Sequence, residues 1–139
     1  MGHSHSVQEA MTPNPTAITA DTTVREAAQR MRDDDVGALP IVDGERLTGV
    51  ITDRDIAVRA IAEGRDAETP VGEIASKDLV TVDPQQTLEE AARLMAQHQV
   101  RRLPVVEEDG RLAGMLAQAD IAQLGHDELT GEIVEQISQ

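Results

Sequence analysis

The strongest constraint on the fold of this chain is that its second half repeats its first half. Residues 23–28 align with residues 87–92, a shift of 64 positions. After the turn at 43–45 the shift becomes 65, because the corresponding turn at 107–110 is one residue longer, and turns tolerate insertions. A repeat of about sixty residues is too small to bury much apolar surface alone, so two repeats are expected to fold together.

Each repeat begins with an extended stretch followed by a helix. The stretches are 16–19 and 79–82, and Thr23 and Thr87 stand three residues before a glutamate, which is the capping-box spacing. Apolar residues then recur at i, i+3, i+4 and i+7, which predicts one buried stripe per helix. The stripe residues are Val24, Ala27, Ala28 and Met31 in the first repeat and Leu88, Ala91, Ala92 and Met95 in the second.

A hairpin and a second helix complete the repeat. The apolar runs 39–42 and 47–51 flank an Asp-Gly turn, and the second repeat follows the same plan. A helix is predicted from Asp53 to about Ala62, with Gly64 as its terminator and with Ile56, Ala60 and Ile61 on its buried side. The predicted class is α+β (α/β), with two β-α-β-β-α domains. The predicted boundaries are a leader at 1–6, domains at 7–63 and 71–124 with a linker at 64–70, and an amphipathic tail at 125–139.

Composition narrows the function classes. The formal net charge of −14 repels nucleic-acid backbones and anionic lipid surfaces, and the absence of Phe, Tyr and Trp removes the platforms on which single-stranded bases stack. Cysteine is absent, which excludes disulfides and thiolate chemistry. No long apolar run is present, so we expect a cytoplasmic protein with no nucleic-acid or membrane partner. No nucleophile elbow, phosphate-binding loop or metal-ligand spacing is found, so we expect neither an enzyme nor a metal site.

The Leu-Pro-Ile-Val strand at 39–42, the Gly-Val-Ile-Thr-Asp-Arg-Asp-Ile segment at 49–56 and their duplication together resemble a cystathionine-β-synthase (CBS) domain pair, or Bateman module. The resemblance covers residues 7–124. It implies a pseudo-twofold pair whose clefts take adenosine-containing ligands, and a small stand-alone regulator that acts through conformational change. The ligands considered are AMP, ADP and ATP, with S-adenosylmethionine less favoured and no cofactor required.

The resemblance also assigns ligand contacts. A Thr/Ser-x-x-Asp motif at the second helix holds ribose hydroxyls in this family, and Thr52 and Asp55 complete it here. A carboxylate suits that role because hydrogen bonds to charged acceptors are strong. The alternative is that Asp55 only caps the helix. In the second repeat Asp120 is kept, but Ala117 replaces the threonine, which predicts one good site or two unequal ones.

Phosphate groups of the ligand are assigned to Arg54, Arg101 and Arg102, since a guanidinium fork matches phosphate oxygens. The alternative is that these arginines pair with surface carboxylates. By analogy, adenine contacts the extended stretches, although these residues are also expected to pair in the sheet. The residues concerned are Pro15, Thr16 and Ala17 in the first repeat and Leu79, Val80 and Thr81 in the second.

Homodimerisation through the apolar faces of the second helices is expected from the same resemblance. A separate, unidentified protein partner would read the ligand-dependent change. The competing hypothesis is a structural or stress-related CBS-pair dimer that binds no nucleotide and acts through protein partners.

Overall fold

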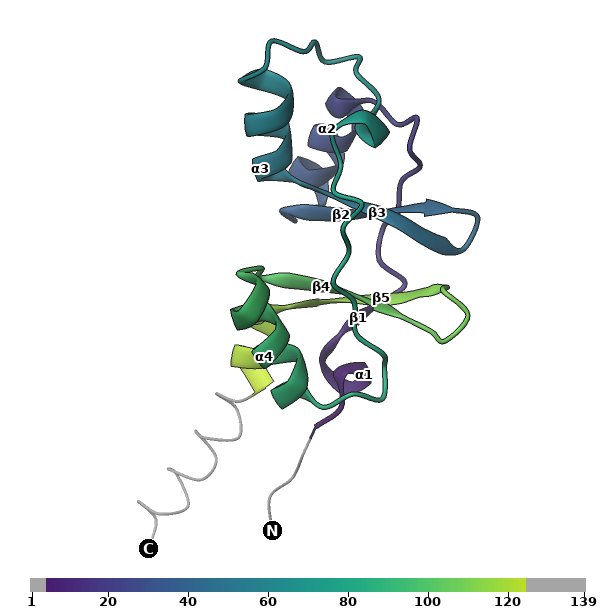
Figure 1. The fold of residues 1–139 in the computed structure, drawn as a ribbon, viewed down its shortest axis with the longest axis vertical. Coiled ribbons are helices and arrows are strands. Elements are labelled where there is room, and N and C mark those ends of the chain that lie inside the picture. The colour runs from purple at the N-terminus through teal and green to yellow at the C-terminus, as the bar shows by residue number, and fades with distance from the viewer. Residues whose placement is uncertain (1–4, 125–139) are drawn as a thin grey trace, which may run out of the picture. The chain divides into compact units, whose positions relative to one another are not determined.

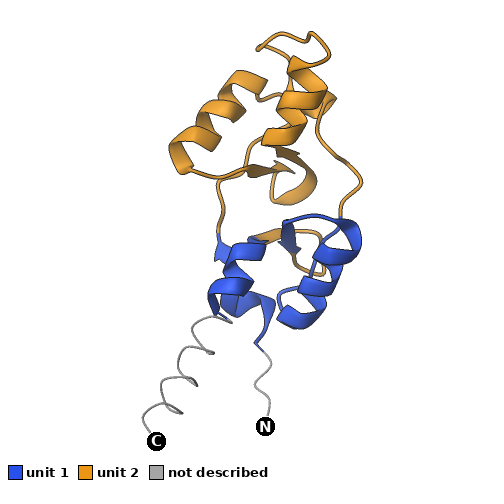
Figure 2. Ribbon diagram, turned by 90° about the vertical axis from the view of Figure 1, so that its left-hand side faces the viewer, with its two compact units in different colours: residues 1–13, 80–105, 114–139 blue, residues 14–79, 106–113 orange. Residues whose placement is uncertain are grey.

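A computed structural model describes residues 5–124, which form two compact units (Figures 1 and 2). One unit contains residues 5–13, 80–105 and 114–124, and the other contains residues 14–79 and 106–113. The units therefore differ from the repeats at their edges, because the first segment of each repeat belongs to the unit of the other repeat.

This exchange of segments is carried by equivalent main-chain hydrogen bonds. Helix α1 (Val7–Ala10) begins with the Val7 N–H, which donates to the Gln86 carbonyl at 2.8 Å. The 3₁₀ helix η2 (Val71–Glu73) begins in the same way, with the Val71 N–H donating to the Thr22 carbonyl at 2.8 Å. Because Val7 aligns with Val71, and Gln86 with Thr22, each repeat lends its first turn to the other.

The unit built around the first repeat contains helix α2 (Val24–Asp34) and strands β2 (Ala38–Asp43) and β3 (Arg46–Thr52). The two strands pair antiparallel from Ala38–Thr52 to Asp43–Arg46, which confirms the predicted hairpin. Ile18 bridges β2 in parallel at Ile41, and Ser76 bridges β3 at Val50. Short helix α3 (Asp53–Asp55) and the π-helix η1 (Ile56–Ile61) follow.

The unit built around the second repeat contains helix α4 (Leu88–His98) and strands β4 (Arg102–Val106) and β5 (Leu112–Ala117). Strand β1 (Thr12–Pro13) completes a sheet of order β1-β5-β4. Val82 bridges β4 at Val105, as Ile18 bridges β2. Residues 118–124 are helical. Mixed helix and strand content and the tandem domains confirm the predicted fold class.

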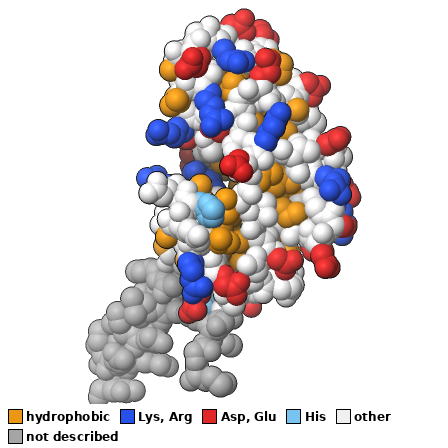
Figure 3. Space-filling model, in the orientation of Figure 1, with side chains coloured by type: hydrophobic (Ala, Val, Ile, Leu, Met, Phe, Trp, Pro, Cys, Tyr) orange, Lys and Arg blue, Asp and Glu red, His pale blue; other side chains and the backbone are white. Residues whose placement is uncertain are grey.

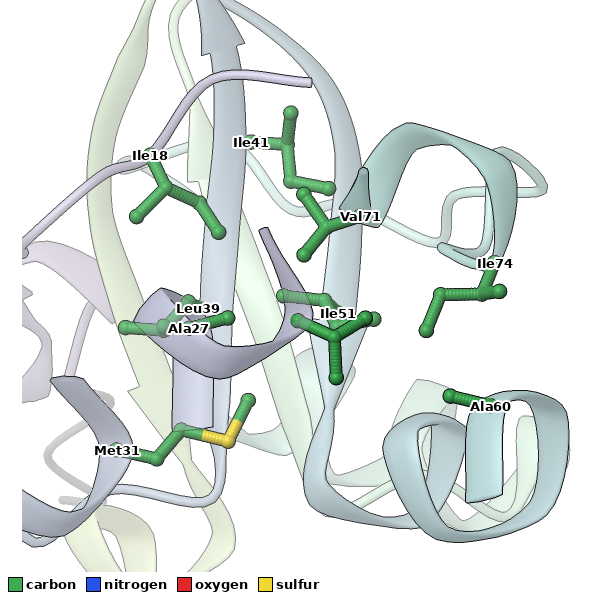
Figure 4. Close-up of a cluster of buried hydrophobic side chains, with 10 residues drawn as sticks. Ile18, Ala27, Met31, Leu39, Ile41, Ile51, Ala60, Val71 and Ile74 are labelled. Atoms are coloured by element: carbon green, nitrogen blue, oxygen red, sulfur yellow. The ribbon is translucent and has the colours of Figure 1, made fainter. Parts of the chain in front are cut away.

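A cluster of aliphatic side chains fills the first unit (Figure 4). Val24, Ala27 and Met31 form the buried stripe of α2, with Leu39, Ile51 and others opposite them. The prediction for Ala28 and its counterpart Ala92 is wrong, since both are exposed. Their position at i+4 places them on the flank of the stripe, where each lines an open groove beside the second helix of its repeat.

The second helix of the first repeat differs from its prediction. Ile61 is 65% exposed rather than buried, whereas Ala60 is fully buried and Ile56 packs against the core. Hydrogen bonds here run from residue i+5 to i, as from the Ala62 N–H to the Ala57 carbonyl at 2.9 Å. This wider winding rotates the following residues away from the positions that a 3.6-residue period predicts. The helix ends before Gly64, which has φ +76° and so supplies the left-handed conformation.

The tips of the two hairpins meet within the first unit. The Leu47 N–H donates to the Gly110 carbonyl at 3.2 Å, and the Leu112 N–H donates to the Glu45 carbonyl at 2.9 Å. At the second tip, the backbone N–H of Arg111 donates to the Asp109 carboxylate and lowers the pKa of Asp109.

Two further predictions concern the ends of the chain, namely a leader at 1–6 and an amphipathic tail at 125–139. His5 and Ser6, assigned to a leader, instead belong to the fold: the His5 carbonyl accepts from the Leu88 N–H at 2.9 Å, and Ser6 bridges Thr87. The predicted amphipathic tail at 125–139 lies outside the described residues. In the part of the chain that the structure describes, no helix is long and apolar enough to cross a membrane.

Candidate functional site at the start of the second helix

Strand β3 ends at Thr52, and the next helix begins there with a complete capping box. The Thr52 hydroxyl oxygen accepts from the Asp55 N–H at 3.0 Å, and the Asp55 Oδ2 accepts from the Thr52 N–H at 2.9 Å. The Asp53 N–H donates to the Gly37 carbonyl at 2.9 Å, which ties the helix start to the beginning of β2. The sequence Thr-Asp-Arg-Asp therefore fixes a helix start at the end of the strand.

The structure shows Asp55 in the capping role, and the cap does not use every polar atom of Thr52 and Asp55. Asp55 Oδ1 accepts no backbone hydrogen bond, and the Thr52 hydroxyl acts only as an acceptor in the cap, so its proton is available. The Asp55 side chain is 15% exposed. Such an oxygen accepts from a hydroxyl, as a ribose would require.

The second repeat keeps only half of this arrangement. The Asp120 Oδ2 accepts from the Ala117 N–H at 2.8 Å, and the Gln118 N–H donates to the Arg101 carbonyl at 2.7 Å. These bonds reproduce those of Asp55 and Asp53. Ala117 has no hydroxyl, so the reciprocal bond to the Asp120 N–H is missing. The two helix starts therefore differ in the structure, because the second lacks one of the two cap hydrogen bonds that the first forms.

The extended stretch of the first repeat lies at the same end of its sheet as Thr52. Ile18 bridges Ile41 in parallel, so the residues before Ile18 run along β2 toward its Ala38 end, where Ala38 pairs with Thr52. Pro15 is half-buried, and Thr16 and Ala17 are exposed. Side chains of this stretch and of the helix start therefore share one edge of the unit.

In the second repeat the corresponding stretch runs toward Val82, which bridges Val105. Leu79 and Val80 are half-buried and Thr81 is exposed. Leu79 falls in the unit of the first repeat, whereas Val80 and Thr81 fall in the other. The structure therefore divides these predicted adenine contacts between two units.

The three predicted phosphate-binding arginines have exposed side chains without a partner. Within the described residues, the guanidinium groups of Arg54, Arg101 and Arg102 form no ion pair or hydrogen bond, whereas five other arginines pair with nearby carboxylates. The alternative that these three pair with surface acids is therefore not observed. Figure 3 shows basic side chains spread among acidic ones on one face of the molecule. Arg54 belongs to the first-repeat unit, and Arg101 and Arg102 belong to the other.

Sequence reasoning missed a cavity of about 700 Å³ in the first unit. It lies between residues 19–21, the β2–β3 hairpin and residues 70–77, and none of the predicted site residues lines it. At its rim the Thr19 hydroxyl donates to Asp21 at 2.5 Å and lowers the pKa of that carboxyl. The cavity is assembled from three separate segments, so no local motif signals it.

The duplicated strand-helix-hairpin-helix unit, with exchanged first segments and a capped second helix, places this chain among the tandem α+β modules. The chain belongs to the CBS domain family, whose pattern matches residues 7–61 and 71–127. It is 46% identical over 117 residues to the CBS domain-containing protein YhcV of Bacillus subtilis, covering 84% of this chain and 83% of that protein. Both repeats are therefore CBS domains, and the relative is a small CBS pair of comparable length.

Several solved structures share this fold and differ in the ions or ligands bound to them. Hypoxic Response Protein I, with two coordinated zinc ions, has a TM-score of 0.79 at 40% identity and covers 86% of this chain and 98% of its own. CBSX2 in complex with AMP has a TM-score of 0.78 at 28% identity, with coverage of 88% and 97%. The MJ0100 CBS pair with 5-methylthioadenosine and S-adenosyl-L-methionine has 0.83 at 25%, with 91% and 99%.

The described residues contain no counterpart of a multi-ligand metal site. Among residues 5–124 no group of three or more His, Cys, Asp or Glu side chains is placed to hold a metal ion. His5 instead contacts Glu9, with Nδ1 and Oε2 2.7 Å apart. His3 and His126 lie outside the described residues.

Proposed function

We propose that this chain is a non-catalytic regulatory module that binds an adenine nucleotide, with Asp55 and Thr52 holding the ribose. The observation that supports the proposal is the helix start itself. The cap fixes the Asp55 carboxylate through Oδ2, while Oδ1 accepts no hydrogen bond, with the Arg59 Nε 3.8 Å away, and the threonine proton is not used in the cap. The structures of CBSX2 with AMP and of MJ0100 with adenosine derivatives support the ligand class.

The arginines without protein partners favour nucleotides over S-adenosylmethionine. Arg54, Arg101 and Arg102 carry guanidinium groups without protein partners, and a guanidinium matches phosphate oxygens but repels a sulfonium cation. The resemblance to CBS pairs assigns these arginines to the phosphate. Ligand binding would shift the equilibrium between two conformations of the module, and a protein partner would read the shift.

Thermal unfolding with AMP, ADP, ATP and S-adenosylmethionine tests the proposal. A ligand at one hundred times its dissociation constant adds about 2.7 kcal/mol to the free energy of unfolding. For a chain of this length that corresponds to an increase in Tm of roughly 6–11 °C. We expect this increase with at least one nucleotide and a smaller one with S-adenosylmethionine.

The informative variant is Asp55→Asn, because an amide oxygen still accepts from the Thr52 N–H and so preserves the cap. We expect it to lose most of the nucleotide-dependent increase. Asp66→Asn is the matched control, since Asp66 also accepts a backbone N–H, from Glu68 at 2.9 Å, away from the site. Absence of any nucleotide effect on the parent protein would favour the structural CBS-pair dimer, for which Ala117 is the supporting observation.

We also propose that the module is a homodimer formed through its second helices. Val58 and Ile61 of η1 are 47% and 65% exposed, and a groove of about 380 Å³ lies between α2 and η1. A corresponding groove of about 500 Å³ lies between α4 and residues 118–122. Light scattering should give a dimer mass for the parent protein and a monomer mass for Ile61→Glu, with Glu63→Lys as an exposed control on the same helix end.

A further inference from the structure

A cation that the predicted site does not include stands beside the Asp55 carboxylate. The Arg59 Nε lies 3.8 Å from the Asp55 Oδ1. Since Oδ2 accepts from the Thr52 N–H, Arg59 faces the one carboxylate oxygen that the cap leaves free. The Asp55 side chain is 15% exposed and that of Arg59 is 55% exposed, so this pair is partly sheltered from water.

The guanidinium of Arg59 is also held from its other side. Its Nη1 donates to the carbonyl oxygen of Ile74 at 3.3 Å. Ile74 is a buried residue just after η2, in the segment that the second repeat contributes to this unit. The rigid fork of a guanidinium lets one side chain serve two acceptors, which a single ammonium does less well. Arg59 therefore bridges a fixed backbone carbonyl and the carboxylate of the helix start.

The second repeat has no such bridge. Leu124 occupies the position aligned with Arg59, four residues after Asp120, just as Arg59 is four residues after Asp55. The aligned leucine cannot offset the charge of Asp120. The contrast between the repeats therefore includes a cation as well as the threonine hydroxyl.

We propose that Arg59 is a positioning and specificity-determining residue for the first site, holding the Asp55 carboxylate and offsetting its charge so that a phosphate-bearing ligand is admitted. This inference rests on the function proposed above. An uncompensated carboxylate at the ribose repels the phosphate of a nucleotide, whereas an uncharged nucleoside does not experience that repulsion. Loss of Arg59 should therefore discriminate between ligands by their charge.

Calorimetric titration with AMP and with adenosine tests the specificity role. Arg59→Met keeps the aliphatic stem but removes the charge, and should lower AMP affinity about fivefold, the size expected of a partly exposed ion pair. Adenosine affinity should change less than about twofold by the same electrostatic argument. Arg59→Lys should recover most of the AMP affinity. Arg65→Met removes an equal charge from the Arg65–Glu73 pair of the same unit and should leave both affinities unchanged.

Hydrogen exchange on the ligand-free protein tests the positioning role separately. In Arg59→Met the Thr52 amide should exchange severalfold faster, because its acceptor is less firmly held, while the Asp53 amide, bonded to the Gly37 carbonyl, serves as an internal reference. Equal losses of AMP and adenosine affinity, or unchanged Thr52 exchange, would overturn the inference. If the parent protein binds neither ligand, the proposed function fails and the specificity role with it, while Thr52 exchange still decides the positioning role.

Discussion

The two helix starts show which part of a repeated motif is structural. Asp55 and Asp120 each accept the backbone N–H three residues earlier, at 2.9 and 2.8 Å. An aspartate at this position is therefore explained by capping in both repeats. What differs is its surroundings: the first repeat adds the Thr52 hydroxyl and the Arg59 guanidinium, where the second has Ala117 and Leu124. The contrast between the two repeats therefore lies in those neighbours rather than in the aspartate.

The largest expected effect concerns what the repeats share. Ile51 and Leu116 occupy aligned positions and are both fully buried. Replacing either with Ala should lower the free energy of unfolding by about 2–5 kcal/mol, because each truncation leaves a cavity. Urea unfolding measures both. A loss below about 1 kcal/mol at one site would show that its repeat can collapse around the cavity and is packed less firmly.

The second prediction compares the two glycines that lie against the exchanged segments. Gly49 and Gly114 are aligned, and each lies beside the segment that the other repeat contributes. A Cβ at Gly114 would lie 2.7 Å from the Thr12 carbonyl oxygen, whereas one at Gly49 would lie 3.2 Å from the Ser76 carbonyl oxygen. Gly114→Ala should therefore cost about 2–3 kcal/mol by forcing β1 from its partner, and Gly49→Ala about 1 kcal/mol. Equal costs in urea unfolding would mean that β1 moves as easily as the Ser76 segment.

The sequence predicts contacts within one helical turn, but it does not predict which distant segments pack together. Thr23 and Thr87 accept from the N–H groups of Glu26 and Glu90 as the capping spacing predicts, because a cap depends on residues within one turn. The exchange of segments 7–13 and 71–76 was not predicted. The two segments align with each other, so local pattern cannot say which repeat each one packs against. Ile61 fails for another reason, since the π-winding of η1 changes the helical period.

At the candidate site, too, the local motif was predicted and the distant contact was not. The motif at Thr52 and Asp55 is contiguous, so the sequence places it at a helix start, and the structure agrees. Arg59, which we propose as a positioning residue, was not predicted, although it is only four residues from Asp55. Its second anchor, the Ile74 carbonyl, lies 15 positions away and is a backbone group without a side-chain signal. A spacing of i to i+4 between an acid and an arginine on this helix was the one available indication.

Removing the first-repeat hydroxyl should make the two helix starts alike. Thr52→Ala deletes the acceptor of the Asp55 N–H and should cost about 1 kcal/mol of stability, the usual value for a lost N-cap. Thr52→Ser keeps the hydroxyl and is the control, with an expected cost of only a few tenths of a kcal/mol. Chemical denaturation of the three proteins gives the difference. A cost equal to that of Thr52→Ser would show that water replaces the hydroxyl at this cap.

The reverse change, which adds a hydroxyl to the second repeat, has the smallest expected effect on stability. Ala117→Thr places a hydroxyl where the Asp120 N–H has no side-chain acceptor, and should raise the free energy of unfolding by about 0.5 kcal/mol. Ala117→Val, which has the same shape without the oxygen, separates the hydrogen bond from the added volume. Because Leu124 still offers no cation, the restored cap should not by itself give the second repeat the AMP preference expected of the first. If Ala117→Thr alone produced AMP binding that Asp120→Asn abolished, the hydroxyl rather than the cation would be the feature that separates the two repeats.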